Sequence, residues 1–102
     1  MIGETLKRIR NIYGFKAKDM CIKLGISASY LSEIENGKKK PSYELLTKYA
    51  DAFGVKLSSL ILLSENYEIA KERNDGSAFI RSLMLKLIDG MSGDMEGVDG
   101  KA

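Results

Sequence analysis

The chain has 102 residues, 44% of them hydrophobic and 29% charged, and a formal net charge of +2. This composition is typical of a small globular domain with one modest core. The sequence has no apolar run near the roughly 20 residues of a membrane span, no signal-peptide core, no histidine and no metal-ligand or phosphate-loop motif, so we expect a cytoplasmic protein that is not an enzyme, uses no metal or cofactor and enters no membrane.

The first predicted helix spans residues 3–13. Leu6, Ile9 and Tyr13 fall on one helical face, and Gly14 follows as a C-terminal stop. The basic residues of this segment lie outside that apolar face and are expected to be solvated.

Two short helices, 17–24 and 28–36, are predicted on either side of a sharp turn. The first has apolar residues at the spacing of one helical face, namely Ala17, Met20, Cys21 and Leu24. Gly25 can adopt the left-handed conformation that ends a helix, and Ser27 can cap the next one. The second helix needs few apolar residues for its buried side. Its small and polar residues are therefore expected to point outward, and these are Ala28, Ser29, Ser32 and Glu33.

A loop with three consecutive lysines, 36–42, leads to the last two helices of the predicted domain. Ser42 is expected to cap a helix over 43–53, and a short helix over 59–63 follows. The predicted fold is therefore an all-α domain of five helices that ends at residue 63.

The remaining residues divide into three segments. Residues 64–76 are polar and are either a linker or a loosely attached helix, 77–89 form a helix with a broad apolar stripe, and 90–102 are rich in glycine and acidic residues and predicted to be flexible. The stripe consists of Phe79, Ile80, Leu83, Met84, Leu87 and Ile88. It could pack back on its own domain, but the five-helix core is already complete, so we predict that it forms a homodimer.

Charge is distributed unevenly between these parts. Residues 1–63 carry eleven lysines and arginines against six acidic residues, whereas residues 64–102 carry five against eight. Such an asymmetry is typical of a polyanion-binding surface joined to a segment with another task.

The chain resembles the helix-turn-helix repressors of the phage Cro and lambda-repressor (XRE) type. Counted from Ala17, a small residue stands fifth and a glycine ninth, with apolar residues at positions four, eight, ten, fifteen and eighteen. These residues are Cys21, Gly25, Met20, Leu24, Ile26, Leu31 and Ile34. The resemblance covers about residues 3 to 63. It departs from the family at Lys16 and Ala17, where the family usually has threonine or serine followed by glutamine.

The resemblance implies a sequence-specific double-stranded DNA-binding regulator of transcription, and a repressor above all. The implied base contacts are Ala28, Ser29, Ser32 and Glu33. The implied phosphate contacts are Lys16, Ala17, Lys18, Asn36, Lys38, Lys39, Lys40 and Ser42. It also implies a structural ion pair between Arg10 of the first helix and Glu35. A dimer is expected to bind a palindromic operator.

Two other functions remain open at this stage. The fold could serve as a protein-interaction module that does not bind DNA, which the missing glutamine at Ala17 favours. The protein could also be an antitoxin-type regulator, with a protein partner bound by residues 64–102. Salt-dependent binding to random duplex DNA would separate a DNA-binding protein from a pure interaction module.

Overall fold

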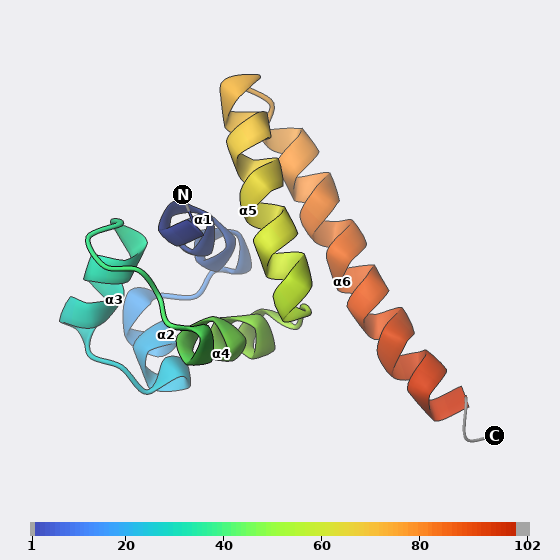
Figure 1. Ribbon diagram of the computed structural model, residues 1–102, viewed down its shortest axis with the longest axis horizontal. Helices are drawn as coiled ribbons and strands as arrows, with labels where there is room; N and C mark the ends of the chain where they lie inside the picture. Colours follow the sequence, from blue (N-terminus) through green and yellow to red (C-terminus); the bar gives the residue numbers. More distant parts are fainter. Residues whose placement is uncertain (1, 100–102) are drawn as a thin grey trace. The chain divides into compact units, whose positions relative to one another are not determined.

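The computed structural model describes residues 2–99, with side chains for residues 2–89, and every regular element in this part of the chain is a helix (Figure 1). This confirms the predicted all-α fold. The helices are α1 Ile2–Tyr13, α2 Ala17–Leu24, α3 Ala28–Glu35, α4 Tyr43–Phe53, α5 Leu57–Glu72 and α6 Gly76–Asp99. Among the described residues, no helix combines the length and the apolar character needed to cross a bilayer.

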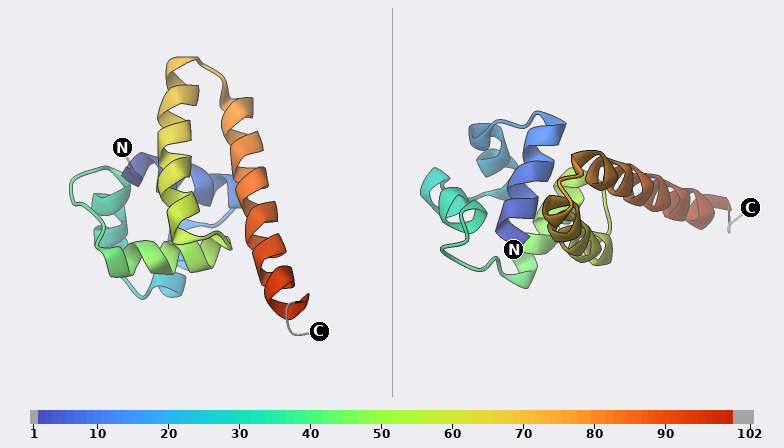
Figure 2. Two further views of the ribbon diagram at one scale, coloured as in Figure 1. Left: turned by 45° about the vertical axis from the view of Figure 1, so that its right-hand side comes forward. Right: turned by 90° about the horizontal axis from the view of Figure 1, so that it is seen from above.

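The chain forms two compact units, Met1–Phe53 and Gly54–Ala102. The first contains α1 to α4, and the second is an antiparallel hairpin of α5 and α6 (Figure 2). The sequence predicts a domain boundary after residue 63, but α5 continues through this position without a break. Residues 54–63 therefore belong to the hairpin unit.

The turn between α2 and α3 is built by the residues that its sequence indicates. Gly25 has a left-handed φ of 68°, and Ser27 Oγ accepts a hydrogen bond from the backbone N of Tyr30 at 3.1 Å. The apolar face of α2 is buried except at Ala17, which is exposed. The N-terminus of α2 is consequently open to solvent.

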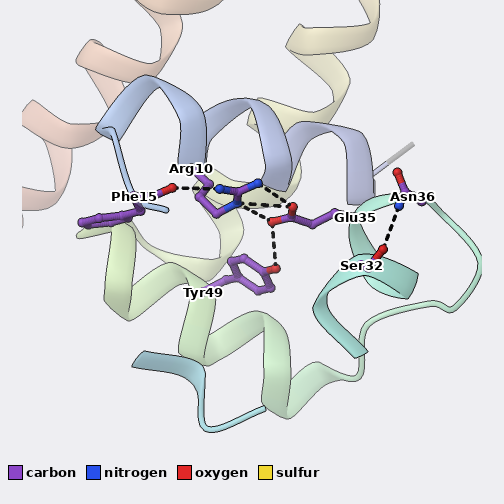
Figure 3. A network of polar contacts seen from close by, with 6 residues as sticks. All are labelled: Arg10, Phe15, Ser32, Glu35, Asn36 and Tyr49. Carbon is purple, nitrogen blue, oxygen red and sulfur yellow. Dashed lines mark hydrogen bonds and ion pairs between the residues drawn. The ribbon is translucent and has the colours of Figure 1, made fainter. Parts of the chain in front are cut away.

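A buried polar network connects α3 to α1 and α4 (Figure 3). Arg10 donates to both carboxylate oxygens of Glu35, from Nε to Oε2 at 2.9 Å and from Nη2 to Oε1 at 3.0 Å. Arg10 Nη1 also donates to the carbonyl of Phe15 at 2.8 Å, and Tyr49 OH donates to Glu35 Oε2 at 3.5 Å. Burial, followed by the Glu35 carboxylate, raises the pKa of Tyr49, so its phenol keeps the proton that it donates. The ion pair implied by the family resemblance is thus present and links α1 to α3.

Gly3 permits a close approach of α1 to the C-terminal end of α3. A Cβ atom added at Gly3 would lie closer than 3.0 Å to the backbone carbonyl oxygen of Ile34, a separation that real Cβ atoms essentially never show. Nothing local in the sequence of the first helix demands a glycine at this position. The glycine is needed because of its contact with Ile34, which lies 31 positions along the chain.

The hairpin unit is where the structure departs most from the prediction. The helix expected over 59–63 is the start of the longer α5, which takes in most of the segment left open between a linker and a loose helix, 64–76. Leu60, Leu63 and Ala70 are buried, and the ring of Tyr67 meets that of Phe79 edge-on, with centroids 5.1 Å apart. Leu60, Leu63, Tyr67 and Ala70 have the spacing of one continuous helical face. This pattern cannot be recognised from residues 64–76 alone.

α6 begins at a side-chain cap and extends beyond its predicted end at residue 89. Asp75 Oδ1 accepts hydrogen bonds from Ser77 Oγ at 2.7 Å and from the backbone N of Ala78 at 3.2 Å, and the bond from Ser77 lowers the pKa of Asp75. Residues 90–99, predicted to belong to a flexible tail, are helical backbone of α6, and residues 100–102 lie outside the described residues.

Replacing Glu35 by alanine should destabilise the protein strongly, by about 3–5 kcal/mol, because the guanidinium of Arg10 would remain buried without its counter-charge. Glu33→Ala is the matched control on the same helix, since its ion pair with Lys39 is exposed and should contribute no more than about 1 kcal/mol. Urea denaturation of both variants measures the difference. Equal losses of unfolding free energy would contradict the proposed importance of the buried pair.

Replacing Gly3 by alanine should lower the free energy of unfolding by about 1–3 kcal/mol, because the new methyl group must push α1 away from Ile34. Gly76→Ala provides the control, since Gly76 also lies at a helix start and a Cβ atom there meets open space. That variant should be as stable as the parent or slightly more stable. Thermal melting followed by circular dichroism compares the two, and an unchanged melting temperature for Gly3→Ala would show that the contact is not tight.

Candidate nucleic-acid interface

α3 presents one buried and one exposed side. Leu31, Ile34 and Glu35 are buried, at 2%, 0% and 6% exposure. The four predicted base-contacting residues lie on the other side of the helix. Ala28, Ser29 and Ser32 are exposed and Glu33 is half-exposed. The structure therefore brings the four together on one solvent-facing side of a single helix.

Asn36 and Ser32 are hydrogen-bonded to each other at the end of this exposed side (Figure 3). Asn36 caps the C-terminus of α3, and its Nδ2 donates to Ser32 Oγ at 3.1 Å. Both side chains are exposed. The pairing fixes the direction in which the Ser32 hydroxyl can act, because an oxygen that accepts from Asn36 retains its own hydrogen for another partner.

The three lysines that follow α3 have different surroundings. Lys39 Nζ lies 3.6 Å from Glu33 Oε1 and 5.7 Å from the centre of the Tyr30 ring, so this side chain folds back against α3. Lys38 and Lys40 are exposed, and their side chains form no ion pair with the described residues. These two are therefore the lysines of the loop that are ready to meet an anion.

The other predicted phosphate-contacting residues lie at two helix starts. Ser42 Oγ accepts from the backbone N of Leu45 at 3.1 Å and thereby caps α4. Lys16 precedes α2 without a side-chain capping bond, and Lys16, Ala17 and Lys18 are all exposed. Helix N-termini carry unpaired N–H groups and partial positive charge, which suits an anionic partner.

A hollow of about 180 Å³ lies among α1, α2 and α3. It brings together residues predicted to contact bases and residues predicted to contact phosphates. It also includes Lys7, which was expected to be solvated. Its lining includes Lys7, Ala17, Ala28, Leu31, Ser32 and Asn36. Lys7 stands one helical turn before Arg10, and this spacing was the only sequence signal that could have indicated its place.

Tyr43 is a second exposed residue that the sequence analysis did not select. It is the first residue of α4, directly follows Ser42 and is 74% exposed. An aromatic ring so exposed beside a lysine-rich loop is available to a partner, although the periodic pattern of α4 alone gives no reason to single it out.

The predicted dimerisation stripe is divided by the structure. Phe79 and Leu83 are 2% exposed and are buried within this chain, so they cannot serve as contacts to a second copy without opening the hairpin. Ile80, Met84 and Ile88 remain exposed, and Leu87 is half-buried. Leu85, which was left out of the prediction, is 65% exposed. Phe79 and Leu83 are buried because α6 packs along α5. This packing was not expected, since residues 64–76 were predicted to be a linker or a loosely attached helix.

Comparison with known proteins identifies the first unit independently. A family model described as Helix-turn-helix matches residues 6–60, more than half of the chain. SinR, a helix-turn-helix transcriptional regulator of Bacillus subtilis, is 35% identical over 69 residues, which are 67% of this chain and 60% of SinR. The immunity repressor protein of Bacillus phage phi105 is 26% identical over 99 residues, which are 97% of this chain and 67% of the repressor.

Other relatives differ widely in length. An uncharacterized HTH-type transcriptional regulator of Methanocaldococcus jannaschii is 34% identical over 63 residues, which are 62% of this chain and 96% of that protein. In contrast, the chain spans 22% of a regulator from Archaeoglobus fulgidus and 63% of ClgR from Mycobacterium tuberculosis. No solved structure matches the chain. With residues 6–60 matched and the α2–α3 turn formed as described, the chain belongs to the XRE-type helix-turn-helix family of DNA-binding transcription regulators.

Proposed function

We propose that the protein is a transcriptional repressor that binds a palindromic DNA operator as a homodimer. The observation that carries this proposal is the exposed side of α3, formed by small and polar residues and flanked by exposed lysines. A helix that presents little bulk can enter the major groove, which is about 12 Å wide. The buried network behind it keeps this helix in one orientation.

The base contacts would come from the N-terminal part of α3. Ala28 suits the methyl group of a thymine, and Ser29 and Ser32 can exchange hydrogen bonds with base edges. Glu33 can accept a hydrogen bond from cytosine N4, but it would have to leave its exposed ion pair with Lys39 or share it. Because such an ion pair contributes little, this rearrangement would cost no more than about 1 kcal/mol.

The phosphate contacts would come from residues on both sides of α3. Lys38 and Lys40 lie in the following loop, and Lys16 and Lys18 lie at the start of α2. Contacts of this kind set the register of the protein on the duplex without reading its sequence. Together they favour binding to a polyanion, as the basic character of the first unit also does.

Dimerisation would follow from the limited reach of one recognition helix. Each good base contact discriminates by about 1–3 kcal/mol, so a single α3 cannot easily distinguish one operator from a genome of competing sites. The exposed apolar residues of α6, namely Ile80, Met84, Leu85 and Ile88, offer a surface that a second copy can cover. A symmetric pair would present two recognition helices to half-sites about 34–36 Å apart.

The name of one relative supports repression over activation. The phage phi105 relative, which spans 97% of this chain, is named an immunity repressor. The exposed apolar residues of α6 are equally compatible with a second, protein-binding role of the antitoxin type. The assembly of the isolated full chain distinguishes these two uses.

Replacing Lys38 and Lys40 together by alanine should weaken binding to specific and random duplexes alike. Each lost phosphate contact should reduce the slope of log K against log salt by about 0.9, so the double variant should lose roughly twice that amount. Lys39→Ala should change the slope less, because Lys39 is already paired with Glu33. Fluorescence anisotropy over a salt series measures all three proteins, and a change in the preferred sequence would contradict this assignment.

Replacing Met84 and Ile88 together by glutamate should convert a dimer into a monomer, because paired carboxylates cannot be buried in an apolar contact. Binding to a palindrome should then fall to the level of a single half-site. Ile22→Glu provides the control, since Ile22 is 73% exposed on α2, outside the proposed contact. Sedimentation equilibrium of the full chain decides the matter. A parent protein that is monomeric in solution and on a palindromic duplex would end the dimer proposal.

A further inference from the structure

We infer that the hollow among α1, α2 and α3 receives one thymine of the bound DNA. Its C5-methyl group would rest against Ala17 and Ala28, and its O4 would accept a hydrogen bond from Ser32. The inference rests on the proposed function, since it names the base that this part of the interface reads.

The walls of the hollow have the chemistry that a thymine edge requires. Ala17, Ala28 and Leu31 supply an apolar side, and Ser32 adjoins it with a hydroxyl group. The volume of about 180 Å³ greatly exceeds the space of a single methyl group, which is similar in size to one water at roughly 30 Å³. The methyl group and the neighbouring O4 can therefore enter side by side.

The direction of the hydrogen bond at Ser32 selects the kind of base. Since Asn36 Nδ2 donates to Ser32 Oγ at 3.1 Å, the hydroxyl hydrogen remains to be donated outward. In the major groove the acceptors are purine N7, guanine O6 and thymine O4. Among these, only thymine O4 stands beside a methyl group. A donor next to an apolar wall thus matches thymine better than any other base.

The hollow is poorly suited to a phosphate group. Its lining includes Arg10 and Glu35, and the guanidinium of Arg10 is committed to the Glu35 carboxylate and to the carbonyl of Phe15. Among the described residues that line the hollow, Lys7 is the one cation outside this ion pair. A phosphate seated there would lose water without gaining enough charge-assisted hydrogen bonds in return.

The hollow depends on the small residue at the start of α2. Ala17 is exposed and lines it, whereas the glutamine usual in the family at this position would extend into the same space. Ala17, which departs from the glutamine usual in the family, thereby leaves a recess for a base edge.

The test begins with duplexes selected by the full chain from a random pool. Each thymine of the selected site is then replaced singly by uracil, which keeps O4 and the base pairing but lacks the methyl group. We expect one thymine in each half-site at which this replacement weakens binding about fourfold, the effect of one buried methyl group.

Two variants connect that thymine to the hollow. Ala17→Gln should abolish the uracil effect at this position, because the longer side chain occupies the recess. Ser32→Ala should keep the uracil effect but reduce the preference for thymine over the other bases by about three- to tenfold, the worth of one hydrogen bond. Ala52→Gln is the matched control on α4, away from the hollow, and should leave both quantities unchanged.

Each outcome has one meaning. Absence of any thymine whose methyl group matters, or a uracil effect that survives Ala17→Gln, would overturn this inference while sequence-specific binding, and with it the proposed function, stands. If Lys7→Ala and one neutral methylphosphonate in the duplex cause the same non-additive loss, the hollow holds a phosphate and the inference is wrong. If the full chain binds no duplex in a salt-dependent way, the proposed function itself fails.

Discussion

The orientation of α3 depends on the ion pair between Arg10 and Glu35. An isolated helix of eight residues is unstable in water, and α3 contributes few apolar side chains to the core because its opposite side must remain exposed. The carboxylate of Glu35 accepts three hydrogen bonds from Arg10 and one from Tyr49. Directional bonds from α3 to two other helices, α1 and α4, thus supply the constraint that a small apolar face cannot supply alone.

The ion pair between Arg10 and Glu35 also explains the close contact at Gly3. Arg10 can reach Glu35 only if α1 runs near α3, and Gly3 lets the backbones approach at the end where Ile34 is buried. The guanidinium and the glycine thus act at two points along one helix. A recognition helix held at two points by α1 can present its exposed residues in one register, which base readout requires.

Most of the first unit could be predicted because its helices carry local start and stop signals. Gly14, Gly25, Ser27 and Ser42 mark boundaries by their own conformation or hydrogen bonds, and these effects act within three residues. The long α5 could not be predicted in the same way, because its stripe crosses the assumed boundary at residue 63. The hollow beside Ala17 was equally beyond sequence reasoning, since three separate helices form it.

The apolar stripe of α6 is only partly covered within the chain, and this division bears on the proposed dimerisation. Phe79 and Leu83, one turn apart, are buried, whereas Ile80, Met84 and Ile88 form a second row that remains exposed. A helix that needed a second copy to cover its whole stripe would be unstable as a monomer. Because α5 already covers part of that stripe, the hairpin can fold without a second copy. The exposed row can then be used for association that is not coupled to folding.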